Sequence, residues 1–443
     1  MSTSTASAGK GTGSKRLIVY VAGGVLAAAV AVVLAATYPW SAPAAISPGL
    51  PAPYLTPSVY NWPALVPQPE GRNLHVPPGF QVEVYADGFK LPRFLVEGPS
   101  GEVLVADSLP KPAGSVYILL DKNHDSRPTE RKLLIKGLNM PTGLAFWKDY
   151  LYIAEPESVK RHHYDAKSMT VGPGQEVVSL KHLRDFHWTR TLLFDREGKK
   201  LYVAVGSGSN SALGEDPRRG AINRYNPDGT EHEIYAAGIR NPVGLRWYPG
   251  TDTLWTSVQE RDDMGDELVP DYLTHVQEGG FYGWPYAYIG SHVDPRNAGF
   301  RRMRHPLLWL ETIFKVPQLI RNTIVPDVLL GSHVAPLDTV FYTGRQFPAE
   351  YSGGAFVAFH GSVNRAQRIG YSVAFVPFQH GRPSGPPREF LGGWMLAPDQ
   401  HEVWGRPVGL LQLADGSLLV SDDGGKKLWR ISYVGESPKR SGS

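Results

Sequence analysis

Residues 242–257 read PVGLRWYPGTDTLWTS, and this pattern decides the fold because the chain repeats it. An apolar run follows a turn, a Gly- or Asp-containing turn reverses the chain, and a second apolar run returns, which is typical of an antiparallel β-hairpin. Five other stretches have the same arrangement. The six hairpins are residues 92–107, 141–155, 188–206, 242–257, 335–361 and 406–423.

Two repeats continue into a third and a fourth strand. The added strands are GSVYILLD from 114, ERKLLIKGL from 130, GAINRYNP from 220 and TEHEIYAAGI from 230. Four antiparallel strands that recur about every fifty residues predict a β-propeller.

The two ends of the repeating region complement each other. GFQVEVYADG from 79 resembles a fourth strand without its first three, whereas the last hairpin stops after a third strand, KKLWRISY from 426. A shared blade would close the ring and remove its exposed sheet edges. We therefore predict an all-β, six-bladed β-propeller over 79–433 and a disordered tail over 434–443. The irregular interval 285–334 predicts a loop over one face.

The amino terminus predicts a membrane anchor. Residues 17–36 form an uncharged apolar run of the ~20 residues that span a bilayer, and Lys15-Arg16 precede it. We expect a cytoplasmic tail over 1–16, a transmembrane helix over 17–36 and a Pro-rich linker over 37–78. The protein would then sit in the inner membrane with its large domain in the periplasm. The alternative is a signal peptide cleaved near Ala42-Pro43-Ala44.

Composition excludes several classes of protein. Three of the 45 basic residues lie in the first forty positions, so 42 basic residues balance 42 acidic ones in the rest of the chain. A nucleic-acid-binding protein would show a clustered basic surplus. The sequence has no cysteine, which excludes disulfides, thiolate metal sites, iron–sulfur clusters and covalently attached haem. Electrons from a redox reaction would need a separate carrier.

The turns that enter the first strand of each blade should converge around the propeller axis. Those positions are Pro92-Arg93, Pro141-Thr142, His187-Trp188, Arg240-Asn241, His333-Val334 and Arg406-Pro407. One arginine alone would be a solvated loop charge. Several cations at equivalent positions repel one another unless an anion compensates them, so the ring predicts an anionic ligand.

Several motifs together resemble one family. They are HWTRTLLFDREGKKLYVAVGSGSN, GIRNPVGL, QERDDMGDEL, GGFYGWPY, FHGSVNR and GRPVGLLQLADGSLLVSDDGG, in chain order from 187 to 425. The chain resembles the pyrroloquinoline-quinone (PQQ) dependent glucose and sorbosone dehydrogenases over nearly all of 75–433, and most of all their membrane-bound L-sorbosone dehydrogenase branch.

The resemblance implies a cofactor site. By motif position, Arg240 and Asn241 match the pair at the quinone carbonyls, and Arg406 matches an arginine that binds a carboxylate of PQQ. Arg365 is the cation nearest to the family's cofactor-binding lysine. His333 stands where the sugar dehydrogenases have a threonine beside the cofactor. Arginine suits a planar tricarboxylate because its fork binds carboxylates in pairs of hydrogen bonds.

The resemblance makes His187 the catalytic base, with Arg240 beside it. Oxidation of an alcohol or an aldehyde hydrate needs a base for the hydroxyl proton, and an imidazole suits this role. The glucose enzymes have an aspartate where this chain has Ser207, and Asp185 is a possible substitute. The alternative is that His187 only caps a strand and forms a hydrogen bond to a blade turn.

The acidic stretch 259–268 predicts calcium binding, because Ca²⁺ prefers carboxylate and carbonyl oxygens. The resemblance places a cofactor-bridging calcium on the carbonyls of Glu260 and Arg261. Asp266, Glu267 and Tyr282 match a second calcium site. The alternative is a solvated acidic turn.

We therefore expect a PQQ-dependent dehydrogenase that oxidises a sugar or a sugar-derived aldehyde. Its electrons would pass to a membrane quinone or cytochrome. A calcium-dependent lactonase on the same fold and a non-catalytic binding propeller are the alternatives, because a fold alone does not fix an activity.

Overall fold

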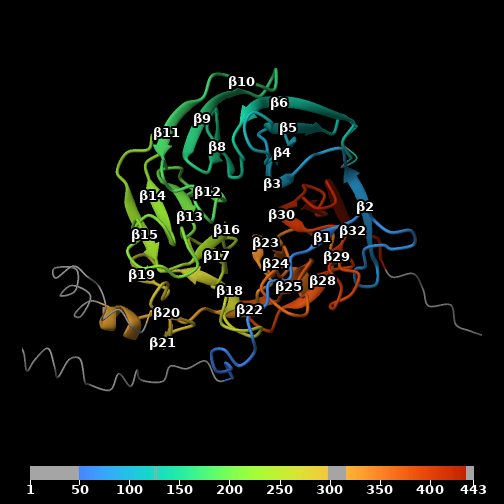
Figure 1. The fold of residues 1–443 in the computed structure, drawn as a ribbon. Helices are drawn as coiled ribbons and strands as arrows, with labels where there is room; N and C mark the ends of the chain where they lie inside the picture. Colours follow the sequence, from blue (N-terminus) through green and yellow to red (C-terminus); the bar gives the residue numbers. More distant parts are fainter. Residues whose placement is uncertain (1–48, 124, 126, 298–315, 436–443) are drawn as a thin grey trace, which may run out of the picture.

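Six antiparallel sheets surround a central axis in the computed structural model, which describes residues 49–123, 125, 127–297 and 316–435 (Figure 1). This arrangement confirms the predicted six-bladed propeller. The innermost strands are β3 (Pro92–Glu97), β7 (Leu144–Trp147), β12 (Arg190–Phe194), β16 (Asn241–Trp247), β23 (Pro336–Phe341) and β30 (Pro407–Gln412). Neighbouring innermost strands contact each other all the way around the ring.

The other strands follow in order toward the rim. The second strands are β4 (Val103–Asp107), β8 (Tyr150–Glu155), β13 (Leu201–Val205), β17 (Leu254–Gln259), β24 (Ala355–Phe359) and β31 (Leu418–Asp422). The third strands are β5 (Gly114–Leu120), β9 (Ser158–Asp165), β14 (Ala221–Tyr225), β18 (Pro270–Val276), β25 (Ser372–Val376) and β32 (Lys427–Tyr433). The outer strands are β6 (Glu130–Leu138), β10 (Thr170–Val171) with β11 (Gln175–Ser179), β15 (Glu233–Ala237), β22 (Val328–Ser332), β28 (Arg388–Leu391) and β2 (Phe80–Ala86).

The second strands explain why the apolar runs are continuous. Every residue of β4 (VLVAD), β13 (LYVAV) and β24 (AFVAF) is buried. A strand that packs against a blade on each of its faces has no solvent side, so its sequence does not alternate between apolar and polar residues.

Ring closure joins the two ends of the repeating region, as predicted. Strand β2 pairs antiparallel with β32, with Phe80 opposite Tyr433 and Ala86 opposite Leu428. The Phe80 ring meets Phe347, Phe390 and Tyr433 at centroid distances of 4.8, 5.0 and 4.9 Å. Closure therefore also anchors the last blade to the fifth.

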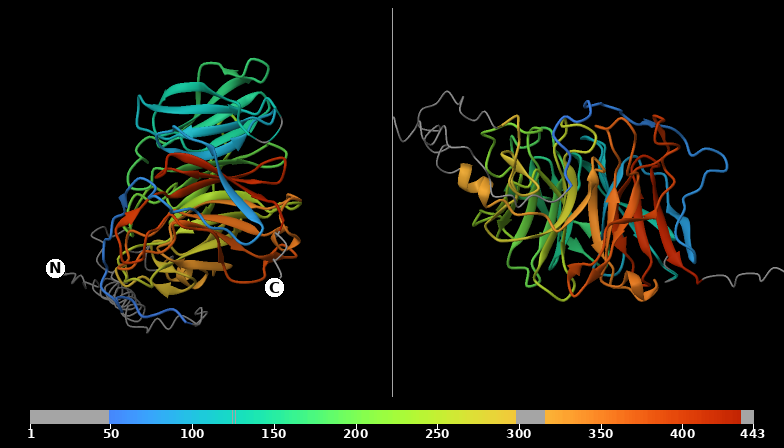
Figure 2. Two further views of the ribbon diagram at one scale, coloured as in Figure 1. Left: turned by 90° about the vertical axis from the view of Figure 1, so that its right-hand side faces the viewer. Right: turned by 90° about the horizontal axis from the view of Figure 1, so that it is seen from below.

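Residues 49–78, expected to be part of a linker, pack against the propeller; we call them the N-terminal strap. Figure 2 shows this segment, in blue, crossing one face of the ring. Strand β1 (Ala64–Leu65) pairs in parallel with β29 (Glu402–Val403). Asn61 is buried, and its side-chain oxygen accepts a hydrogen bond of 2.6 Å from Arg368. The strap is therefore not a free tether, because its backbone and side chains bond to propeller loops.

The interval after β18 combines a loop with a blade strand. A small hairpin, β20 (Ala287–Tyr288) and β21 (His292–Val293), and a helical turn at 316–321 precede β22, which completes the fourth blade. The expected anchor at 17–36 lies outside the described residues, as does the tail beyond 435. In the part of the chain that the structure describes, no helix has the length and apolar character to cross a membrane.

Ring closure gives a stability prediction. Phe80→Ala should lower the free energy of unfolding by about 3–5 kcal/mol, because it removes a buried aromatic from the closing strand. Val84→Ala on the same strand is the control, since Val84 is exposed and should change that free energy by less than about 0.5 kcal/mol. Denaturant unfolding measures both. Equal losses in the two variants would contradict this account of closure.

Candidate active site

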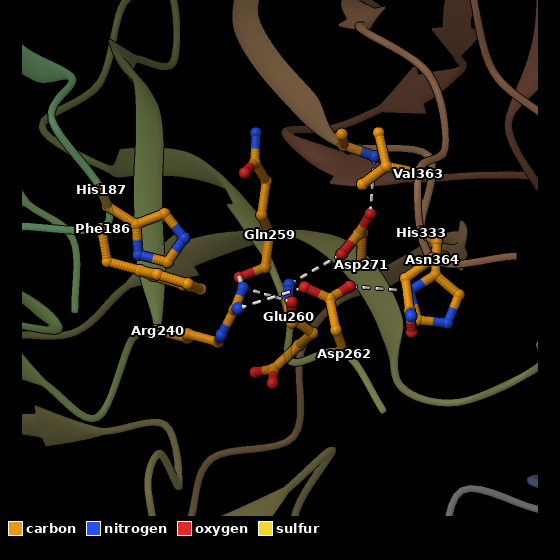
Figure 3. A pocket seen from close by; sticks show the side chains of 11 residues that line it. Phe186, His187, Arg240, Gln259, Glu260, Asp262, Asp271, His333, Val363 and Asn364 are labelled. Atoms are coloured by element: carbon orange, nitrogen blue, oxygen red, sulfur yellow. Dashed lines mark hydrogen bonds and ion pairs between the residues drawn. The ribbon is translucent and has the colours of Figure 1, made fainter. Parts of the chain in front are cut away.

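Residues from several blades meet in one pocket beside the axis, as the convergence of the entry turns predicts (Figure 3). The volume of the pocket is about 100 Å³, which is smaller than the ~300–1,000 Å³ of a typical small-molecule site. Its walls are Phe186, His187, Arg240, Gln259, Glu260, Asp262, Asp271, His333, Ala335, Val363 and Asn364. The predicted residues His187, Arg240, His333 and Glu260 are thus brought together.

His187 lies just before β12, and its ring is held by one partner residue. Nδ1 is 3.0 Å from the carbonyl oxygen of Ser207 and 3.0 Å from its Oγ. A carbonyl can only accept, so we assign the hydrogen to Nδ1, which leaves the Nε2 lone pair to accept a proton. Burial lowers the pKa of His187 well below its ordinary value, and the charge of Arg240 lowers it further. The ring is therefore neutral at physiological pH.

Asp185 does not orient His187, although the sequence left this possibility open. Its side chain is 84% exposed, and its carboxylate lies 3.9 Å from Arg219. The Ser207 carbonyl takes the orienting role. Sequence reasoning missed it because a backbone carbonyl is present at every residue and carries no side-chain signal.

Arg240 is 2% exposed and forms part of the pocket wall. Its guanidinium donates to the carbonyls of Asn210 and Glu260 at 3.1 and 2.5 Å, and it lies 3.5 Å from the Asp262 carboxylate. The adjacent Asn241 donates to Gln259 Oε1 at 3.0 Å, but its own buried Oδ1 has no hydrogen-bond partner. An unmatched buried acceptor beside a cation indicates a place for a polar ligand.

A second histidine faces His187 across the pocket in a different charge state. His333 Nδ1 lies 3.2 Å from Asp262 Oδ1, and its Nε2 lies 3.0 Å from the Gly265 carbonyl. Burial alone would lower the pKa of His333, but the hydrogen bond and charge of Asp262 outweigh it and raise the pKa. Both partners accept, so the ring donates from both nitrogens as an imidazolium.

A further cluster of buried charges occupies the entry turns of the first and last blades. Arg93 pairs with Asp423 at 2.6 Å, and His360 Nε2 lies 3.0 Å from the same carboxylate. Arg406 donates from Nε to the His360 carbonyl, and its guanidinium carbon lies 5.8 Å from the centroid of the Tyr371 ring. Within the described residues, no carboxylate pairs with Arg406.

His360 and Asp423 were missed as site residues by the sequence analysis. Both directly follow the second strand of their blade, as Glu260 does. Their position could have identified them, because a polar residue directly after a second strand faces the entry turns that carry Arg93 and Arg406.

Arg365 lies against the acidic loop and is not among the residues that line the pocket. It pairs with the Glu267 carboxylate and donates to the Asp266 carbonyl at 2.5 Å. Its charge is therefore paired with a carboxylate of the protein, whereas Arg406 has no such partner among the described residues. The resemblance placed Arg365 beside a cofactor, and the structure gives it these other partners.

Several residues of the expected calcium sites have other partners in the structure. The Glu260 carbonyl accepts from Arg240, and the buried Arg261 side chain pairs with Glu260 and Asp294 at 3.0 Å each. Tyr282 donates to the His275 carbonyl at 2.7 Å. Among the residues that the structure describes, no three His, Cys, Asp or Glu side chains form a possible metal site. The predicted sites use backbone carbonyls, two carboxylates and a tyrosine, so this absence does not test them and they stay predictions.

Comparison with known proteins gives the family. The model of the TrAA12-like family matches residues 74–433. A pyrroloquinoline quinone-dependent pyranose dehydrogenase of Coprinopsis cinerea is 24% identical in an alignment of 418 positions, which covers 81% of this chain and 54% of the relative. The chain thus spans about half the length of that relative.

Solved structures show the same fold. The holo form of the pyranose dehydrogenase PQQ domain from Coprinopsis cinerea superposes with a TM-score of 0.66 and 21% identity, over 83% of this chain and 98% of that domain. A calcium structure of the Trichoderma reesei family AA12 enzyme gives a TM-score of 0.64 and 22% identity, over 85% and 98% of the two chains. These structures confirm the fold, and the family model shows that the chain belongs to the TrAA12-like family; the sorbosone branch stays untested.

The two pocket histidines should titrate in opposite directions from the ordinary value of about 6.5. At about pH 6, His187 should be neutral because its pKa is lowered, whereas His333 should be protonated because its pKa is raised. NMR titration of the ring C–H signals, assigned with His187→Gln and His333→Gln, measures this. Asp262→Asn should lower the pKa of His333. A pKa at or above 6.5 for His187 would contradict the assignment.

Proposed function

Since the chain belongs to the TrAA12-like family, we propose that it is a PQQ-dependent dehydrogenase that oxidises a sugar or a sugar-derived aldehyde. The observation that carries the proposal is the pocket itself. It holds a neutral, oriented imidazole together with Arg240. Arg240 and the adjacent Asn241 match the family's pair at the quinone carbonyls.

The residues present fit a planar tricarboxylate. Arg406 has no carboxylate partner in the described part of the chain, and the buried Arg93 Nε and Asn241 Oδ1 have no hydrogen-bond partner. Charge-assisted hydrogen bonds from an arginine fork to a carboxylate are among the strongest polar contacts in proteins. Arg406 would therefore hold a carboxylate of PQQ, while Arg240 and Asn241 would lie at its quinone carbonyls.

PQQ supplies a quinone that accepts the hydride from the substrate carbon. The chain supplies the rest of the reaction. His187 Nε2 takes the proton of the substrate hydroxyl, so that a carbonyl group forms as the hydride leaves. The Ser207 carbonyl accepts the Nδ1 hydrogen, keeps the ring in the required tautomer and stabilises the positive ring that results. Burial lowers the pKa of His187 and the charge of Arg240 lowers it further, so the ring is unprotonated before the substrate arrives.

Calcium is included in the proposal only because a solved structure of a similar protein is described as a calcium structure. The Trichoderma reesei structure is described as a calcium structure, but the carbonyl expected to bind a bridging ion here accepts from Arg240. No step of the reaction is assigned to the ion.

We also propose that residues 17–36 hold the protein at the membrane and that a membrane quinone or cytochrome takes its electrons. The apolar run and the absence of cysteine support this. The full chain should then fractionate with membranes. Recovery of the full-length protein in the soluble fraction would contradict the proposed anchor.

His187→Ala should lower the turnover number by roughly 10²–10⁴, the usual contribution of a positioned base, while PQQ still binds. Sugar-dependent reduction of a dye by the PQQ-loaded protein measures turnover, with aldoses and sorbosone as substrates. Asp185→Ala is the control, because its exposed carboxylate does not contact the ring, and it should keep wild-type turnover. Turnover of His187→Ala within tenfold of wild type would remove His187 from the mechanism. The absence of any PQQ-dependent reaction in wild type would favour a lactonase or a binding propeller.

A further inference from the structure

Phe186 is a large apolar side chain that the fold leaves exposed at the pocket. It directly precedes the proposed base, lines the pocket and is 54% exposed. Its backbone φ is 62°, in the left-handed region that bulky residues rarely adopt. The residue therefore costs conformational energy and recovers little of it through burial, a combination that is typical of functional positions.

Two buried arginines fix the loop that carries Phe186. Arg190 donates to the carbonyls of His187 and Thr189 at 2.8 Å each and also to that of Leu183. Arg219 donates to the carbonyls of Asp185 and His182 at 3.3 and 2.9 Å. The backbone on both sides of Phe186 is thus held by charge-assisted hydrogen bonds. The exposed ring is presented by a rigid support rather than by a loose loop.

The ring has a defined place relative to the reacting group. Its centroid lies 4.6 Å from that of His187 in an edge-on arrangement, and the Arg240 guanidinium carbon is 5.6 Å from the ring centroid. Figure 3 shows Phe186 and His187 on one side of the pocket and Asp262, Asp271 and Asn364 on the other. One wall is therefore aromatic, and the opposite wall carries hydrogen-bond acceptors.

This pair of walls matches the chemistry of a cyclic sugar. A pyranose ring has a face of C–H groups with partial positive charge, which an aromatic face attracts, and it has hydroxyl groups that carboxylates and amides accept hydrogen bonds from. An acyclic aldehyde or polyol has hydroxyls but no rigid C–H face. The geometry therefore favours a ring-form sugar over an open-chain substrate.

We propose that Phe186 is a stacking platform that binds the C–H face of a pyranose and places its reactive hydroxyl at His187 Nε2. The proposal rests on the proposed function and specifies its substrate class. It assigns Phe186 a role in sugar binding and none in cofactor binding.

The test compares the PQQ-loaded full chain with Phe186→Leu and Phe186→Tyr. Leucine keeps an apolar side chain but removes the aromatic face, so KM for glucose should rise about tenfold while kcat stays within about threefold. Oxidation of glyceraldehyde, which has no ring, should stay within about twofold of wild type, and the PQQ titration should be unchanged. Phe186→Tyr should restore the wild-type KM. Leu133→Ala, an exposed apolar residue on β6, is the control and should behave as wild type.

A second measurement is independent of turnover. Saturation-transfer NMR with 1-deoxyglucose, which lacks the C1 hydroxyl, should show binding to wild type and a loss of most of that binding in Phe186→Leu. If wild type binds 1-deoxyglucose but oxidises no sugar, the proposed function is wrong while the role of Phe186 in sugar binding is kept. If Phe186→Leu binds it as wild type does, or if glucose and glyceraldehyde are affected equally, the platform is wrong. Loss of PQQ binding in Phe186→Leu would also overturn the proposal.

Discussion

Buried carboxylates at the ends of second strands hold the entry turns of the innermost strands in the first and last blades, and the placement of the charged residues on these turns depends on this contact. Asp107 at the end of β4 accepts the backbone N–H groups of Lys90 and Leu91, just before β3. Asp422 at the end of β31 accepts the N–H of Arg406 at 2.7 Å, just before β30. Buried backbone donors need partners, and these carboxylates supply them where the chain turns inward.

The same kind of contact, a buried carboxylate that accepts N–H groups, positions charged residues of the site. Asp422 also accepts the indole N–H groups of Trp394 and Trp429, so the aromatic core of the last blade and the turn that carries Arg406 share one anchor. Asp271 accepts the N–H of Glu260 at 2.7 Å and that of Ala335 at 2.8 Å, which joins the wall of the pocket to the entry of β23. Buried carboxylates of the first, fourth and last blades thus fix these turns, and the ring brings the blades together.

The periodic features of the fold could be predicted from the sequence, because each blade repeats the same local pattern. The six hairpins, the closing strand β2 and the convergence of His187, Arg240 and His333 on one pocket follow from that repetition. The packing of the N-terminal strap could not be predicted. Its Pro-rich sequence has no periodicity, and its contacts, such as Asn61 with Arg368, join residues far apart in the chain.

The site was less predictable than the fold because it depends on partners rather than on residue types. Arg365 and Arg406 are the same residue, yet one pairs with Glu267 and the other has no carboxylate partner among the described residues. The orienting group of His187 is a backbone carbonyl, which no side-chain pattern reveals. The resemblance left Asp185 as a possible partner of His187, whereas the structure gives this role to the Ser207 carbonyl.

The entry turns around the axis should form a binding site for one PQQ, and a cofactor titration tests this most directly. Calorimetric titration of PQQ into the purified full chain, with and without Ca²⁺, should show one saturable site per chain. Arg406→Ala should weaken binding by roughly 10- to 150-fold, the ~1.5–3 kcal/mol lost with one charge-assisted partner, whereas Arg365→Ala should bind as wild type does. The absence of saturable binding, or equal effects of the two substitutions, would contradict the account.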